Sequence, residues 1–507
     1  MTKSNSINVG SASKQNLPIK NIVIVGADVI GWSAAVALAR GLGGQNVNIT
    51  ILDTKSDHAA PNKSLHASEH IFDFHRLLGI QDKNLLMHGH MKLNLGAKFH
   101  AFNRENQAAG DFVLGCDRAM PSFCSIELHQ VLAWLGLNDP EKYSISCAAI
   151  NSNLLAIPTK QTGTMSASFS PSVNLDGDAY LQFMQGAAKH LAIKIVQADI
   201  KDLEQDPENG FVTQITLSSG QILDVDLLLD NSQLNPALQV LSCQRDYINC
   251  GEYLPFDSVL SGFEPTQTAA SPFQQFYGVE GGWIEITTHS NLRNITLHYS
   301  SQLFQDEAAK QVILSHIPNV QGVSLTRKIA RYLTKPLDKN CLTIGQAAGY
   351  LGTSPISSLV LMQRTLSKLL ELFPSKLCLP QNTAELNKRI LKDYQEALHY
   401  TALMIPFSEQ VQENAEMQRY SWHLSIDQLP PELKHKVELF QSSGRIGSEL
   451  NPLISRDAWL NLLKHKVKNR HAYEPVLHAL DKHKAAQFIE QLGLQIEQSI
   501  SRYRPYS

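Results

Sequence analysis

The chain has 507 residues, of which 43% are hydrophobic and 18% are charged. At about 150 residues per domain, this length excludes a single small domain. Lys and Arg number 44 and Asp and Glu 47, which leaves a formal net charge of −3. Without a run of like charge, and without the roughly 18 uninterrupted apolar residues of a membrane span, we expect neither nucleic acid nor membrane as a partner.

The cysteines and the N-terminal segment favour a cytoplasmic protein. Seven cysteines are present, an odd number, and no C-x-x-C pair occurs among them. This usage is typical of free thiols in a reducing compartment. Residues 1–19 are rich in Ser and Asn and lack a secretory apolar run, so we expect a disordered leader.

The first ordered segment predicts the opening unit of a dinucleotide-binding fold. Residues 20–26 form a β-branched run that ends in glycine, and residues 32–40 have helix-forming composition. A second apolar run, residues 47–52, closes on Asp53. This order of strand, turn, helix, strand and acid places Asp53 where it would meet a ribose hydroxyl.

The rest of the chain alternates between helical and strand-like patterns before it becomes mostly helical. We expect helices over residues 64–80 and 180–191, strands over 193–200, 212–217, 222–230 and 341–344, a long helix ending near 372, and a mainly helical stretch over 381–507 that breaks at 429–431. This order indicates an α/β protein with a helical C-terminal part.

Several groups of residues in a fixed order carry a resemblance to a known family. They are residues 24–26, 31–35, 74–80, 175–180, 226–232, Gly282 with Trp283, 345–350, His399 with Tyr400, Trp422, and Ala458 with Trp459. With these residues the chain resembles the flavin-dependent tryptophan halogenase family over nearly its whole length.

The resemblance implies an architecture and a chemistry. It implies an FAD-binding Rossmann-like module over residues 20–380, with an inserted cover layer at about 91–184 and 236–324, and a helical module over 381–507 packed on it. The family's chemistry uses reduced flavin and oxygen on a small aromatic, indole-type molecule, with a separate flavin reductase as partner. The oligomeric state stays open, with a homodimer as one option.

The resemblance places the cofactor at the glycine fingerprint and at the turn after the last strand. The fingerprint residues are Gly26, Ala27, Asp28 and Gly31; Asp53 would bind the ribose, and Gly345 and Ala348 form the later turn. Asp28 stands where the fingerprint has its middle glycine. A carboxylate about 5 Å from a phosphate charge costs roughly 3 kcal/mol at an effective dielectric near 20, so we expect weak FAD binding.

Two catalytic features of the family have no counterpart in an ungapped match. The family's lysine position falls on Phe72, and a Gly-Glu pair near the flavin falls on Lys63 and Ser64. A phenyl ring cannot donate the hydrogen bonds of an ammonium group. Lys63 is the first substitute to consider, although a loop lysine is more often solvated surface.

Two further signatures of the family are altered. Its Trp-x-Trp-x-Ile-Pro signature begins here at Trp283, for which a core aromatic on a strand is an equal alternative, and the second tryptophan is replaced by Glu285. The family's catalytic glutamate position is Pro355. Ser357 and Ser358 then form the candidate anion or halide site, although a serine before a Leu-rich helix is more commonly an N-cap.

These substitutions leave three functional hypotheses. The chain is a halogenase-family oxidoreductase with lost or altered halogenation, an inactive paralogue that binds a partner or ligand, or a flavin monooxygenase-like enzyme. We expect no metal site, because His66 and His70 at helical spacing lack accompanying Cys or acidic ligands.

Overall fold

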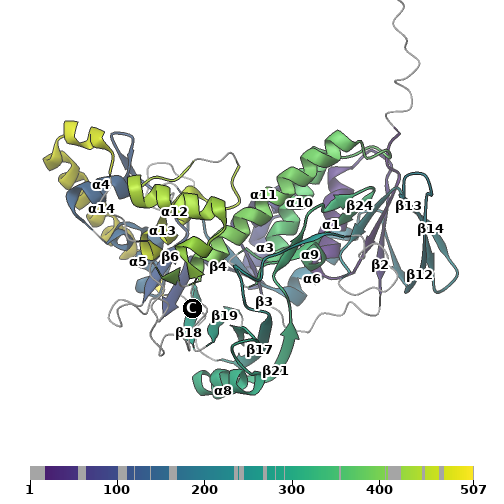
Figure 1. Ribbon diagram of the computed structural model, residues 1–507, viewed down its shortest axis with the longest axis horizontal. Coiled ribbons are helices and arrows are strands. Elements are labelled where there is room, and N and C mark those ends of the chain that lie inside the picture. Colours follow the sequence, from purple (N-terminus) through teal and green to yellow (C-terminus); the bar gives the residue numbers. More distant parts are fainter. Residues whose placement is uncertain are drawn as a thin grey trace, which may run out of the picture.

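The computed structural model describes residues 17–54, 64–100, 111–118, 120–137, 139–158, 168–232, 238, 245–266, 271–279, 281–289, 292–352, 356–405, 407–408, 424–447, 451–467 and 473–505. Lys63, Pro355 and Trp422 lie outside these ranges. Figure 1 shows the long helix α11 (Pro380–Met404) running between a sheet-centred part with α1 and β2 and a helical part with α4 and α14.

A mainly parallel six-stranded sheet forms the nucleotide-type module. Its order is β11 (Ile193–Gln197), β2 (Asn48–Asp53), β1 (Asn21–Val25), β15 (Leu227–Asp230), β24 (Cys341–Thr343) and β23 (Leu337–Asp338), with β23 alone antiparallel to its neighbour. The strands are short apolar runs because both faces are covered.

The side chains of β1 alternate between two cores. Ile22 and Ile24 pack with α1 (Val29–Gly41) and α10 (Ser358–Glu371), whereas Val23 and Val25 pack with the antiparallel sheet of β12 (Ile200–Gln205), β13 (Val212–Leu217) and β14 (Ile222–Asp224). Helix α6 (Gly177–Ala188) lies against α1 and contributes Tyr180 to the first core. This two-sided packing holds the end of β1 and the start of α1 in place.

A second large sheet has seven strands. Its order is β21 (Gln321–Arg327), β17 (Ser258–Pro265), β20 (Leu292–Tyr299), β19 (Gly282–His289), β18 (Gln274–Val279), β5 (Gly96–His100) and β6 (Phe112–Gly115). One face packs on α8 (Asp306–His316) through residues such as Ile284 and Ile286, while Trp283 and Phe276 on the other face belong to the main core. The two faces therefore follow the two-residue period of a strand.

Smaller strand groups connect these layers. They are β3 (Ser64–Ala67), β10 (Ser172–Asp176) and β4 (Met91–Asn94); β16 (Tyr247–Asn249), β22 (Arg331–Leu333) and β25 (Gly349–Tyr350); and the pairs β7 (Ser122–Phe123) with β8 (Ile126–Glu127), β9 (Leu154–Leu155) with β28 (Arg504–Pro505), and β26 (Phe407–Ser408) with β27 (Leu424–Ser425).

The remaining helices pack on the core or on one another. They are α2 (His70–Leu77), α3 (Asp82–Met87), α4 (Leu128–Leu135), α5 (Ile145–Asn151), α9 (Gly345–Ala348), α12 (Pro431–Ser443), α13 (Arg456–Lys466) and α14 (Lys482–Ile500). Leu403, Phe440 and Trp459 of α11, α12 and α13 belong to the same core as β1, whereas α14 packs with α4 and α5 in a second core. The C-terminal helices thus share cores with earlier parts of the chain.

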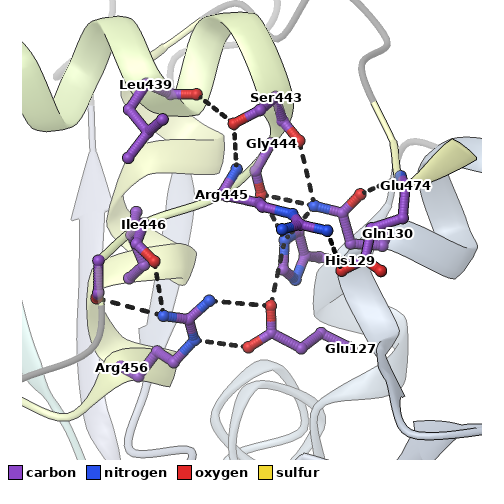
Figure 2. A network of polar contacts seen from close by, with 11 residues as sticks. Glu127, His129, Gln130, Leu439, Ser443, Gly444, Arg445, Ile446, Arg456 and Glu474 are labelled. Atoms are coloured by element: carbon purple, nitrogen blue, oxygen red, sulfur yellow. Dashed lines mark hydrogen bonds and ion pairs between the residues drawn. The ribbon is translucent and has the colours of Figure 1, made fainter.

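Figure 2 shows a polar clasp between α4 and the segment that joins α12 to α13. Arg456 donates to both carboxylate oxygens of Glu127, at 2.5 and 3.0 Å, and Gln130 Nε2 donates to the Gly444 carbonyl at 2.7 Å. His129 Nε2 lies 2.7 Å from the same carbonyl oxygen, and burial lowers the pKa of His129 to about 4, so it stays neutral at pH 7. The clasp ties the C-terminal helices to α4 and the residue before it.

The structure corrects three of the sequence-based boundaries. The helix expected over residues 64–80 is split, because residues 64–67 pair with β10 as strand β3 before α2 begins at His70. The strand expected over 222–230 is two strands, β14 and β15, in different sheets, and the one expected over 193–200 ends at Gln197. In each case the sequence pattern predicted one continuous element across a point where the structure has a break.

Candidate functional site

The turn after β1 has the tight geometry of a dinucleotide cradle. The Gly26 amide donates to the Leu52 carbonyl at 3.0 Å, which brings the turn to the end of β2. A Cβ on Gly31 would lie 1.8 Å from the Gly26 carbonyl oxygen, so only glycine fits where α1 crosses the turn. This close approach is the reason the fingerprint needs a glycine at that position.

Asp28 is the N-cap of α1 and occupies the end of the helix with its own carboxylate. Asp28 Oδ1 accepts from the backbone amides of Ile30 at 2.9 Å and Gly31 at 3.1 Å. These amides belong to the group that a helix N-terminus offers to a phosphate. An internal anion therefore binds the donors that a pyrophosphate would use.

Asn231, at the end of β15, joins the two glycine turns. Its Nδ2 donates to Asp28 Oδ1 at 2.7 Å, and its backbone amide donates to the Val25 carbonyl at 3.1 Å. Gly345 has φ +63°, and a Cβ there would lie 2.3 Å from Asn231 Oδ1. The carboxyl ends of β1, β15 and β24 thus converge on one amide side chain, at the edge where open α/β sheets bind ligands.

The other expected cofactor residues lie around this edge. Asp53 is the last residue of β2, with Oδ2 accepting from Gln197 Nε2 at 3.2 Å, and Ala348 ends the short helix α9. Ala27 lies next to Asp28 in the fingerprint turn and packs against the core. Asp53 and the two glycine turns thus lie at the carboxyl edge of the sheet, and the Asp28 carboxylate lies on the amides at the start of α1.

The structure places the expected catalytic and anion positions on β3, α2 and α10. Phe72 on α2 is partly buried against the main core. Ser357 is the N-cap of α10 and accepts from the Val360 amide at 3.4 Å, and Ser358 is the first residue of that helix. Ser64 lies on β3. The N-cap interpretation of Ser357 is therefore confirmed, because its hydroxyl accepts the hydrogen bond that caps α10.

His66 and His70 do not share a helix face. His66 lies on β3, with Nδ1 3.1 Å from Asn174 Oδ1, and His70 begins α2, with Nε2 2.8 Å from the Leu453 carbonyl oxygen. Within the described ranges no group of three His, Cys, Asp or Glu residues has the arrangement of a metal site.

A second polar region lies where β19 meets β10. Glu285 on β19 stands opposite Phe276 of β18, and its Oε1 accepts from Gln274 at 3.0 Å and Thr287 at 3.3 Å. These are neutral donors, and burial raises the pKa of Glu285 from 4.5 to about 7. Partly accessible and half ionised near neutral pH, Glu285 has the properties of a proton donor or acceptor.

Polar contacts connect the nucleotide turn with this region. Lys328 Nζ donates to Gln346 Oε1 at 2.8 Å, one residue after Gly345, and lies 5.1 Å from the centre of the Tyr350 ring. The negative charge of Glu285 contributes, after burial, to a raised pKa of Tyr350, which places the two side chains close together. Contacts through Gln346 on α9 and Tyr350 on β25 thus connect Gly345 with Glu285.

One histidine and one lysine side chain complete the region. His298 on β20 pairs opposite Trp283 with rings 5.5 Å apart, and burial followed by the charge of Lys328 lowers its pKa to about 3. Lys92 on β4 pairs with Asn174 of β10, and burial lowers its pKa. Both side chains are desolvated groups of the kind that gathers at functional sites.

Sequence reasoning missed most of this second region. Lys92, Lys328 and His298 follow no spacing rule that would mark them, because they come together only through the sheets. Glu285 carried a usable signal, since a carboxylate stands there in place of the second tryptophan of the signature.

Fold and site together define a class of protein. The mainly parallel sheet has a glycine turn after β1, an acid at the end of β2 and a second glycine turn at the same carboxyl edge. This arrangement is typical of a Rossmann-like, FAD-type α/β module. The model of the tryptophan halogenase family matches residues 21–482. The chain therefore belongs to the tryptophan halogenase family.

Individual relatives agree with this assignment. The chain is 21% identical over 468 residues to tryptophan 7-halogenase RebH of Lentzea aerocolonigenes, covering 87% of this chain and 85% of the relative. It is 23% identical over 435 residues to tryptophan 7-halogenase KtzQ of Kutzneria sp. (strain 744), covering 79% and 78%.

Solved structures share the fold. The flavin-dependent halogenase BrvH from Brevundimonas sp. BAL3 superposes with a TM-score of 0.86 at 19% identity, covering 96% of this chain and 98% of that one. Xcc4156, a flavin-dependent halogenase from Xanthomonas campestris, gives 0.85 at 20% identity and covers 96% and 97%. No helix of the described residues is long and apolar enough to cross a membrane.

Proposed function

We propose that this protein is a halogenase-family flavoprotein with weakened FAD binding and with lost or altered halogenation. The observation that carries the proposal is the carboxylate of Asp28 on the Ile30 and Gly31 amides. A pyrophosphate that takes these donors must displace a side chain that Asn231 also holds. Binding of FAD then has to overcome both the lost cap and the charge of Asp28.

If the protein is active, its substrate is a small aromatic molecule of the indole type, and a separate flavin reductase supplies the reduced cofactor. The polar region with Glu285, next to Trp283, supports such a substrate because aromatic surface and a proton-accepting carboxylate lie together. The lysine and glutamate expected from the family stand as Phe72 and Pro355. Halogenation, if retained, would have to use other groups. The candidates are Lys92 and Glu285, whose pKa values are shifted by burial, and Lys328, which contacts Gln346 and Tyr350.

The rival proposal is an inactive paralogue that binds a ligand or partner on the same scaffold. The occupied helix N-terminus favours it, because a cradle closed by its own side chain keeps the fold stable without a cofactor. The two proposals differ in whether flavin binds to the purified protein.

Flavin content and affinity test the proposal. Protein purified without added cofactor is expected to be colourless, and titration with FAD should give a dissociation constant of about 1 μM or higher. Sub-micromolar FAD affinity would overturn weakened binding. Measurable turnover of an indole panel with reductase, oxygen and halide would overturn the inactive rival.

A further inference from the structure

One edge of the seven-stranded sheet is open within the part of the chain that the structure describes. Strand β21 is the first strand in the sheet order, and its pairing partner there is β17. Figure 1 shows β21 beside β17 and near α8, at the lower side of the picture. All residues of β21 except Val323 are exposed. An open edge of this kind presents backbone N–H and C=O groups to a further strand.

The backbone of Leu325 directs its hydrogen-bonding groups away from β17. The Lys328 amide donates to the Asp257 carbonyl at 2.8 Å, so the backbone groups of Lys328 point toward β17. Because this direction alternates along a strand, the backbone groups of Thr326 also point toward β17, whereas those of Leu325 and Arg327 point outward. A strand added at this edge would therefore form its hydrogen bonds with Leu325 and Arg327.

The same edge carries an exposed apolar side chain that continues a buried core. Leu325 is 42% exposed and pairs with Leu260, which is 4% exposed and belongs to the core between the sheet and α8. Val323, on the same face of β21, packs partly against this core. An apolar side chain brought against Leu325 by a further strand would extend the core across the edge.

A β-bulge limits the regular part of the edge. Gly322 has φ +61°, and the register with β17 shifts between Ser261 and Phe263. A bulge bends its strand and interrupts the regular pairing. The regular edge therefore covers residues 323–327, with Leu325 at its centre.

An antiparallel second copy of this edge fits that centre. Two-fold symmetry about Leu325 places Leu325 opposite itself, Val323 opposite Arg327 and, on the other face, Ser324 opposite Thr326. Leu325 then exchanges both of its outward hydrogen bonds with the same residue of the second copy, and apolar and hydroxyl side chains meet their own kind. Symmetry about Arg327 would instead bring two guanidinium groups directly opposite each other, which is unfavourable.

We propose that β21 pairs with β21 of a second copy of this chain, which joins the two sheets in a homodimer. The Leu325 side chains meet on the two-fold axis, on the face that carries α8. Arg327 keeps its partner Asp306, 2.6 Å away on α8 of the same copy. So short an edge is expected to bury less than the roughly 1,200 Å² of a stable interface, so the dimer is weak, with a dissociation constant of about 10 to 100 μM.

Sedimentation velocity of the full-length protein, from about 1 to about 200 μM, tests the proposal. We expect a monomer–dimer equilibrium, which Leu325→Lys shifts at least about tenfold toward the monomer because it places two ammonium groups on the axis. Ile222→Lys changes an exposed apolar residue of another edge strand, β14, and should leave the equilibrium unchanged. A monomer at every concentration, or a dimer that Leu325→Lys leaves intact, would overturn the proposal. Leu325→Pro removes the outward N–H group and serves as a second variant if Leu325→Lys fails to fold.

Cysteine cross-linking tests the register. In a hydrogen-bonded antiparallel pair the two Cα atoms lie about 5.5 Å apart, within the range of a disulfide, so Leu325→Cys should give a covalent dimer on oxidation. Thr326→Cys would meet its own mate only as a diagonal neighbour about 7 to 8 Å away, and should cross-link no more than the wild type, whose Cys124 is exposed. Equal cross-linking of the two variants would overturn pairing about Leu325. These measurements need no flavin, so their outcome is independent of the proposed function.

Discussion

Replacing Asp28 with glycine should convert the fingerprint turn into an open cradle for FAD. The change removes a carboxylate that accepts from the Ile30 and Gly31 amides and from the Asn231 side chain. It also gives the turn the residue that the fingerprint normally has at this position. The amides at the start of α1 then become available to a phosphate group.

The magnitude follows from charge and capping. A carboxylate about 5 Å from a phosphate charge is repelled by roughly 3 kcal/mol at an effective dielectric near 20, which corresponds to about two decades in affinity. Exchange of an aspartate N-cap for glycine costs only a few tenths of a kcal/mol in stability. We therefore expect FAD to bind about ten- to 100-fold more tightly to Asp28→Gly, with little loss of thermal stability.

Quenching of FAD fluorescence or calorimetry measures the effect, with two further variants beside it. Asp28→Asn removes the charge but keeps an oxygen on the two amides, so its gain should be smaller than that of Asp28→Gly. Asp202→Asn removes an equal charge at an exposed position of β12 and should change nothing. Unchanged affinity in Asp28→Gly would refute the reasoning and move the obstacle to the residues after β2.

Three further predictions concern other parts of the molecule. The raised pKa of Glu285 means that its buried carboxyl favours the protonated form, so this group's contribution to stability is present below pH 4.5 and lost as the pH rises through about 7. Glu285→Gln should match the wild type in chemical denaturation at pH 4 and exceed its unfolding free energy above pH 7, by up to about 3.5 kcal/mol at roughly 1.4 kcal/mol per pKa unit. Equal curves at both pH values would contradict this. A chain that ends at residue 380 should be insoluble or unfolded, because it loses Phe440 and Trp459 from the main core. A chain that ends at residue 505 is the control and should behave as the full protein. A soluble, monodisperse and thermally unchanged 380-residue chain would contradict this prediction. Mass spectrometry of free tryptophan after incubation with reductase, oxygen and halide should detect no regioselective chlorination or bromination, and such a product would direct mutagenesis to Lys92 and Lys328.

Local pattern and family resemblance together accounted for the nucleotide module. The alternation of apolar residues, the glycine at position 26 and the acid at position 53 are local signals, and each lies where the sequence predicted. The boundaries failed at residues 64–67, where pairing with β10 decides between strand and helix. Such pairing joins residues more than 100 positions apart, so no local pattern contains it.

The candidate site was predictable only in part, because its chemistry depends on contacts across sheets. The charge of Asp28 was visible in the sequence, but its capping of α1 and its bond to Asn231 needed the fold. The raised pKa of Glu285 arises from burial, which composition does not report. Lys328 reaches the site through Gln346, a contact that depends on how β21 ends beside α9.

A crystal structure of the wild-type protein grown without added flavin tests most directly the claim that Asp28 caps the amides at the start of α1. We predict that the Asp28 carboxylate lies on the Ile30 and Gly31 amides and accepts from Asn231. An Asp28 side chain turned away from the start of α1, with both amides open, would contradict the account.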